Sequence, residues 1–239
     1  MIIYLNHLSD CYETFIPLIP YRIYEPPGCV LQIKSAEENT TDTTATSGTT
    51  PLGSAYEIDV PRSELKWNAF KPTGTHFGTV PIAGGTIYVD GDLITGGSVE
   101  INMAGLEVKD SEGEMKEKLE AHLKGSVPGK EDDFFNVSKY PKATFNILGS
   151  TKLENDPLGT HMINGELRIK DITKPVSFKA VIDLSSGVAL KATAEPFVID
   201  RTEWDIKFKS KKFFDDLKDD FVNDEIKLEL TVGAVKAAQ

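Results

Sequence analysis

The feature that most constrains the fold of this chain is a period of two in its apolar residues. One long segment shows it without interruption, in Val176, Phe178, Ala180, Ile182 and Leu184. Successive side chains of an extended chain point to opposite faces, so the pattern predicts a strand with one buried face. A slip of one residue would bury Lys179 and Asp183 instead, which fixes the register. We therefore expect the apolar face, Ala180 included, to point inward.

The same alternation recurs along most of the chain. The segments that show it are 56–60, 65–69, 75–80, 87–89, 99–103, 143–147, 162–169, 190–199 and 226–232. About eight or more strands at hairpin spacing predict an all-β, antiparallel fold. Because the first and last strands are both amphipathic, we expect them to pair and close a lipocalin-like barrel without free edges. A barrel of about eight strands leaves room for one slender ligand.

One amphipathic helix interrupts the strands. In residues 112–124 the apolar Met115, Leu119 and Leu123 recur every fourth residue among charged neighbours, and Gly125 follows. This spacing predicts a helix with a narrow apolar stripe. Before the last strand, residues 201–208 place Trp204 on the same face as two further apolar side chains, and residues 213–220 predict a short acidic turn of helix.

An aromatic corner follows the predicted helix. Phe134 and Phe135 are adjacent, so both rings are buried only if a turn reorients the chain. Tyr140-Pro141 then forbids helix and leads into an extended segment that contains Phe145. We interpret residues 132–145 as a corner that anchors the helix against the sheet. Its rings pack either in an ordinary core or in the wall of a cavity.

Composition divides the chain into two parts. Residues 35–54 are rich in Ser and Thr and have almost nothing to bury, which predicts a flexible tether. We therefore assign residues 1–54 to an N-terminal segment that is dispensable for folding, and residues 55–239 to one domain. The two cysteines, Cys11 and Cys29, precede the domain, so it holds no disulfide or thiolate site. Cys29 follows Gly28, which leaves open either a lipid anchor or an incidental cysteine.

Charge and motifs exclude several functions. A net charge of -11 argues against nucleic acid and against electrostatic docking on anionic lipid. No apolar run is long enough for a transmembrane helix, and no export signal is recognisable. The chain lacks a serine-nucleophile elbow, a phosphate loop and a dinucleotide fingerprint. Since the histidines, such as His76, show no ligand spacing, we predict no catalytic residues, metal site or cofactor.

A surplus of large side chains on inward faces suggests either a packed core or an apolar cavity. In a cavity, His76 and Arg201 would orient a polar head group. The candidate ligand-binding residues are Trp67, Phe70, His76, Phe77, Phe134, Phe135, Phe145, Phe178, Ala180, Arg201 and Trp204.

Several segments in order resemble the YceI-like family. These are Ser-Glu-Leu-Lys-Trp at 63–67, Thr-His-Phe-Gly-Thr-Val at 75–80, and the hairpin sequence at 165–176. The most specific is Asp-Phe-Phe-Asn-Val-Ser-Lys-Tyr-Pro-Lys-Ala-Thr-Phe at 133–145, and Arg-Thr-Glu-Trp at 201–204 follows the same pattern. The resemblance covers about residues 56–235. One departure is Asp171, which stands where the family hairpin usually has glycine.

This resemblance implies a lipocalin-like barrel that binds a polyisoprenoid lipid, exported to the periplasm or outer surface and in some members lipid-anchored. The expected protein is thus a non-enzymatic carrier, with an apolar lipid as its partner. The sequence leaves open an enzyme that uses His76 as a base, a structural barrel without ligand, and a homodimer. Ligand length, head group and pathway do not follow from the residues.

Overall fold

The computed structural model describes residues 51–238 of the 239-residue chain. The predictions for the Ser/Thr-rich tether and for Cys11 and Cys29 lie outside the described residues. The first strand of the described residues begins at Ser54. No helix in the described part of the chain is both long and apolar enough to cross a bilayer.

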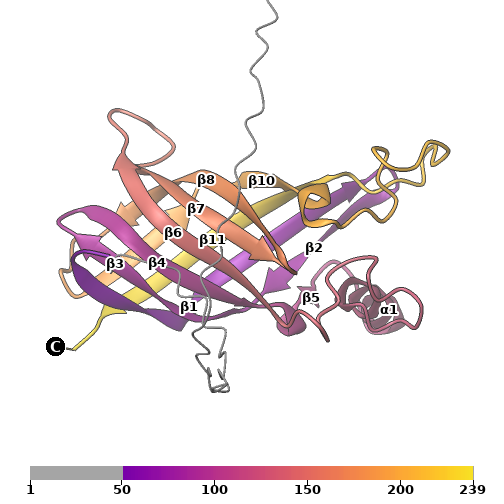
Figure 1. The fold of residues 1–239 in the computed structure, drawn as a ribbon, viewed down its shortest axis with the longest axis horizontal. Coiled ribbons are helices and arrows are strands. Elements are labelled where there is room, and N and C mark those ends of the chain that lie inside the picture. The colour runs from indigo at the N-terminus through magenta and orange to yellow at the C-terminus, as the bar shows by residue number, and fades with distance from the viewer. Residues whose placement is uncertain (1–50, 239) are drawn as a thin grey trace, which may run out of the picture. The chain divides into compact units, whose positions relative to one another are not determined.

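Eleven strands form one antiparallel sheet between residues 51 and 238 (Figure 1). They are β1 (Ser54–Lys71), β2 (Gly74–Val80), β3 (Ile82–Asp90), β4 (Leu93–Asn102), β5 (Glu107–Val108), β6 (Lys142–Lys152), β7 (His161–Ile169), β8 (Ile172–Asp183), β9 (Ala189–Ala194), β10 (Phe197–Asp200) and β11 (Glu225–Lys236). Eight of them close a ring in the order β1-β3-β4-β6-β7-β8-β9-β11, because β11 also pairs with β1. The predicted closed antiparallel barrel is confirmed.

The long strand β1 changes partner along its length. Residues 54–57 pair with β3, whereas residues 65–71 pair with β2. The register of the β1–β11 ladder shifts between Asp59 and Glu64, which marks a bulge where the strand bends. In the same half of the barrel, β5 pairs with the outer edge of β2. There β10 also replaces β9 as the neighbour of β11. The three strands outside the ring, β2, β5 and β10, therefore all build on this half, which we call the cavity end.

The predicted helix is α1 (Gly113–Lys124), which lies at the cavity end (Figure 1). Gly125 ends it with a left-handed backbone, φ 71°, and its N–H caps the last turn. Leu119 and Leu123 pack against the barrel core, whereas Met115 is exposed. The apolar stripe is therefore shorter than the sequence predicts.

The aromatic corner after α1 joins the helix to the barrel as predicted. The backbone N–H of Phe135 donates to the carbonyl of Leu123 at 3.2 Å, and Val137 donates to Lys124 at 2.9 Å. The Tyr140 hydroxyl donates to the Asp171 carboxylate at 2.7 Å. Asp171 lies in the tight β7–β8 turn, so the residue that departs from the family pattern ties this hairpin to the corner.

Two predicted elements before β11 differ in the structure. Residues 201–208 begin with the short 3-10 helix η2 (Arg201–Trp204), where the Asp200 carboxylate accepts from the N–H of Thr202. This cap starts a helical turn, so the apolar residues of 201–208 do not lie along one continuous strand. Residues 213–220 form successive turns and no helix. We call residues 205–224 the η2–β11 loop.

Candidate ligand cavity

The barrel encloses a cavity of about 510 Å³ at the cavity end. This volume lies in the range of small-molecule sites, and most of the lining side chains are apolar. Eight of the candidate residues line it: Trp67, Phe70, His76, Phe134, Phe135, Phe145, Phe178 and Arg201. They come from β1, β2, the aromatic corner, β6, β8 and η2, so the fold gathers in one place residues far apart in sequence.

Three candidate residues lie away from the cavity lining. Phe77 is exposed, because His76 takes the inward-facing position on β2. Ala180 faces inward as predicted, but it is fully packed where β8 meets β7 and β9. Trp204 is buried, and its indole N–H donates to the carbonyl of Leu167 at 3.1 Å. Its role is therefore to fix η2 against the barrel wall.

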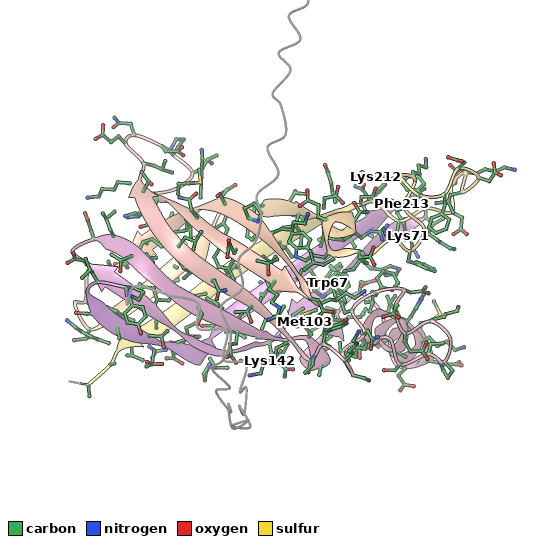
Figure 2. All side chains as sticks on the ribbon, in the orientation of Figure 1. Trp67, Lys71, Met103, Lys142, Lys212 and Phe213 are labelled. Atoms are coloured by element: carbon green, nitrogen blue, oxygen red, sulfur yellow. The ribbon has the colours of Figure 1, made fainter. Side chains whose placement is uncertain are left out.

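Trp67 lies within the barrel wall at this end, as Figure 2 shows. Its β2 partner is Gly78, where a Cβ atom would stand 2.9 Å from the Trp67 ring. The same Cβ atom would stand only 1.9 Å from the Glu107 carbonyl oxygen, so a residue larger than glycine would displace β5 as well as the Trp67 indole. Its N–H is buried and has no hydrogen-bond partner among residues 51–238.

Stacked rings form the inner part of the cavity. Phe178 stacks on Phe197 with ring centroids 4.5 Å apart and an interplanar angle of 11°, and it contacts Phe145 at 5.5 Å. Phe145 lies across Gly165 of β7, where a Cβ atom would approach its ring to 2.4 Å. The glycine therefore sets the position of this aromatic cluster, a constraint that alternation alone does not reveal.

A second aromatic cluster connects α1 to the cavity. His122 of α1 meets Phe134 and Phe208 edge to face, with centroids 5.0 Å and 4.8 Å apart. Its Nε2 lies 2.7 Å from the Asp133 carboxylate, which orients the ring. Sequence reasoning missed His122 as a lining residue. Its spacing from Leu119, three residues along the apolar stripe, was the available signal.

His76 of β2 is held in a similar way. Its Nδ1 lies 2.7 Å from Asp110, whose other carboxylate oxygen accepts the N–H of Phe77 at 2.9 Å. Burial raises the pKa of Asp110, but the hydrogen bonds from Phe77 and His76 outweigh this effect, so the pKa lies below the ordinary value of an aspartate. Asp110 is therefore a carboxylate at neutral pH that fixes the imidazole orientation.

Arg201 faces the cavity, but its guanidinium already has protein partners. It donates to the carbonyls of Ile206 at 2.8 Å, Val222 at 3.0 Å and Asn223 at 3.0 Å, and it pairs with Asp224 at 3.1 Å. Burial lowers the pKa of Arg201, while Asp224 and Asp200 oppose that change. These contacts fasten both ends of the η2–β11 loop. The structure therefore assigns Arg201 to holding the loop, whereas the sequence suggested head-group binding.

The outer rim of the cavity is polar and comes largely from segments that the sequence pattern did not highlight. The lining there includes Lys71, Lys130, Lys209, Asp219 and Asp220. Lys209 and Asp220 form an ion pair at 2.5 Å. A polar rim around an apolar interior suits a ligand with a long apolar part. Between residues 51 and 238, no cluster of three or more His, Cys, Asp or Glu side chains has metal-binding geometry.

Solved structures share this barrel. BcnA of Burkholderia cenocepacia matches with a TM-score of 0.56 and 16% identity, over 74% of this chain and 99% of that one. A polyisoprenoid binding domain from Saccharophagus degradans matches with a TM-score of 0.55 and 10% identity, over 77% of this chain and 99% of the other. At these identities the likeness concerns the fold.

Sequence comparison agrees. UPF0312 proteins of Shewanella sp. (strain W3-18-1) and Shewanella putrefaciens are 39% identical over 59 residues, 25% of this chain and 26% of each relative. The match thus spans about a quarter of the length of these curated relatives. A model described as a YceI-like domain matches residues 56–234, well over half of the chain. As its motifs predicted, the chain belongs to the family of YceI-like domains.

Proposed function

We propose that this protein is a carrier that holds an isoprenoid-type lipid inside the barrel. The observation that carries the proposal is the cavity of about 510 Å³, whose inner wall is built from stacked phenylalanine rings. The Saccharophagus degradans domain with this fold is described as polyisoprenoid-binding, which supports the same ligand class. A branched apolar chain would contact these rings along its length.

Apolar burial would supply the affinity. Each Å² of apolar ligand surface removed from water contributes roughly 25 cal/mol, before the cost of ordering the ligand is subtracted. The Arg201 guanidinium is already engaged by protein groups, so a charged head group would remain at the rim beside Lys71 and Lys130. The bound lipid would therefore enter apolar end first.

Native mass spectrometry of the protein purified from its own host tests the proposal. We expect an added mass that organic extraction removes and that chemical analysis identifies as an isoprenoid lipid. Protein without added mass, before and after supply of an isoprenoid alcohol such as farnesol or geranylgeraniol, would contradict the carrier role and favour a structural barrel.

Two alanine substitutions sharpen this test. Ala143 is buried and lines the cavity, whereas Ala180 is buried in packed surroundings. Ala143→Trp should fill the cavity and abolish lipid retention at nearly unchanged stability. Ala180→Trp should instead destabilise the protein by about 1 to 3 kcal/mol or more, because overpacking strains a filled core. Equal destabilisation by both variants would argue that the interior has no usable space.

An enzyme is the second candidate, and the His76–Asp110 pair at the cavity wall is the observation that favours it. A carboxylate-oriented imidazole is a suitable general base. Incubation with isoprenoid alcohols followed by chemical analysis distinguishes the two, since a carrier returns its ligand unchanged. Product formation that His76→Gln removes would establish the enzyme.

The place where the carrier works is also part of the proposal. The family resemblance favours a periplasmic or outer-surface protein, with Cys29 as a candidate lipid anchor and a homodimer as a candidate assembly. Cell fractionation with a Cys29→Ser variant tests the location and the anchor. Sedimentation of the purified chain tests the assembly.

A further inference from the structure

Half-exposed phenylalanines gather at the cavity end of the barrel. Those between residues 51 and 238 are Phe70, Phe77, Phe213 and Phe214, each 45% to 49% exposed. The large exposed apolar side chains elsewhere on the described chain, such as Leu148 and Leu158, are aliphatic. Clustering of aromatic side chains on one part of a surface marks an interaction site, whereas single apolar side chains need no explanation.

One of these rings belongs to the cavity wall, and two others lie on the loop beside the cavity rim. Phe70 is half exposed and also lines the cavity. Phe213 and Phe214 lie on the η2–β11 loop, which contributes several rim residues. The N–H of Asn223 donates to the carbonyl of Phe70 at 2.9 Å and joins the loop to β1. Figure 2 shows Phe213 in the same corner of the molecule as Lys71. We call Phe70, Phe213 and Phe214 the aromatic tip.

Three lysines of the η2–β11 loop pair with carboxylates of the protein. Lys207 pairs with Asp205, and Lys212 pairs with Asp200. Lys209 likewise pairs with a loop carboxylate. The Lys207 ammonium also lies 5.0 Å from the Phe213 ring centroid, so its side chain lies along the ring. With a net charge of -11 for the chain, long-range attraction to an anionic surface is unfavourable. Attraction at this tip has to be apolar.

We propose that the aromatic tip inserts into the interfacial layer of an electrically neutral lipid bilayer and turns the cavity mouth toward the membrane. Aromatic side chains favour the membrane–water interface, and neighbouring lysine side chains extend their charged ends back to water. Through such contact, an apolar molecule passes between bilayer and barrel without crossing water. The docking itself does not depend on the proposed carrier function, which supplies only its purpose.

Flotation of the full-length protein with phosphatidylcholine vesicles tests the docking. We expect binding that is the same at 0.1 M and 0.5 M NaCl, because apolar insertion is not screened by salt. Phe213→Ser combined with Phe214→Ser should weaken the partition coefficient by about tenfold or more, since the exposed parts of two rings lose their burial in lipid. Both side chains are half exposed and lie on a loop outside the barrel strands, so the thermal midpoint should fall by no more than a few degrees.

A matched control uses exposed apolar side chains on β6 and in the β6–β7 loop. Leu148→Ser combined with Leu158→Ser removes side chains that are 63% and 48% exposed. This variant should bind vesicles as the wild type does. Transfer of a fluorescent isoprenoid alcohol from vesicles to the protein should be slowed by the phenylalanine variant and not by the leucine variant, with equilibrium loading unchanged.

Three results would overturn the docking proposal. The first is vesicle binding that the phenylalanine variant leaves unchanged. The second is binding that requires anionic lipid and is released by salt. The third is no vesicle binding together with self-association that the phenylalanine variant abolishes, which would make the tip a protein contact. Vesicle binding by a protein that takes up no isoprenoid would contradict the carrier function alone.

Discussion

Replacing Arg201 by methionine should detach the η2–β11 loop and strongly destabilise the barrel. The guanidinium is 3% exposed and serves three main-chain carbonyls and the Asp224 carboxylate. Methionine fills much of the same volume but donates to none of them. Removing one partner of a buried ionic network typically costs about 3 to 5 kcal/mol, because the remaining polar groups stay buried and unpaired. For a domain of this size, that corresponds to a decrease of roughly 6 to 20 °C in melting temperature.

Calorimetry of wild type and Arg201→Met measures this loss. Hydrogen exchange of the amides of residues 205–224 reports whether the loop opens before the barrel does. Lys212→Met is the matched control, because it removes an exposed cation from the same loop and should change the melting temperature little. If Arg201→Met lost lipid while its melting temperature and loop protection stayed unchanged, the arginine would be a head-group ligand and our assignment would be wrong.

Three further predictions concern the barrel wall. The pKa of Asp110 lies below the ordinary value of an aspartate in the folded protein, so its contribution to stability is present above the pKa of the unfolded chain and is lost as the pH falls through the lower folded pKa. Acid titration of Asp110→Asn should therefore show a smaller loss of stability than the wild type in that acidic range. Gly165→Ala should displace the Phe145 ring and destabilise the protein by about 1 to 3 kcal/mol, measured by urea unfolding, and full stability would contradict the close approach. His161→Leu should change the thermal midpoint by only a few degrees, because it removes a buried Nε2 that has no partner among the described residues but also the 2.8 Å hydrogen bond between Nδ1 and the Thr160 hydroxyl, whereas a fall of about ten degrees or more would contradict this balance.

The barrel itself could be predicted because alternation is a one-dimensional signal. Each buried strand face repeats every second residue, and the amphipathic first and last strands required closure, as the β1–β11 ladder shows. The helix could be predicted equally well from the spacing of its apolar residues and from Gly125 at its end. These features depend on residues close in sequence. The motif at 133–145 then identified the family, because its order of residues is specific.

The site was harder to predict than the barrel. Whether a side chain lines the cavity depends on how far along the barrel its residue lies, and not only on whether it is on the inward face of its strand. Ala180 and Phe178 share one face of β8, yet only Phe178 reaches the cavity, because Ala180 lies further toward the opposite end of the barrel. Head-group binding was expected of Arg201, but its hydrogen-bond partners in the structure include main-chain carbonyls, which every residue type offers equally, so no sequence pattern could indicate them. His122 was missed because a single histidine on a helix is usually structural.

The order in which the ring closes governs how the domain folds. β1 and β11 are the first and last strands of the domain, and Tyr56 pairs with Lys236. When only the first ten strands have been synthesised, the sheet therefore still has two unpaired edges. The barrel closes only after the twelve residues of β11 have been added. Pairings so distant in sequence make folding slow and expose the edges to aggregation in the meantime. A chain that ends before Glu225 should accumulate as an aggregate, even though most of the cavity lining has already been made.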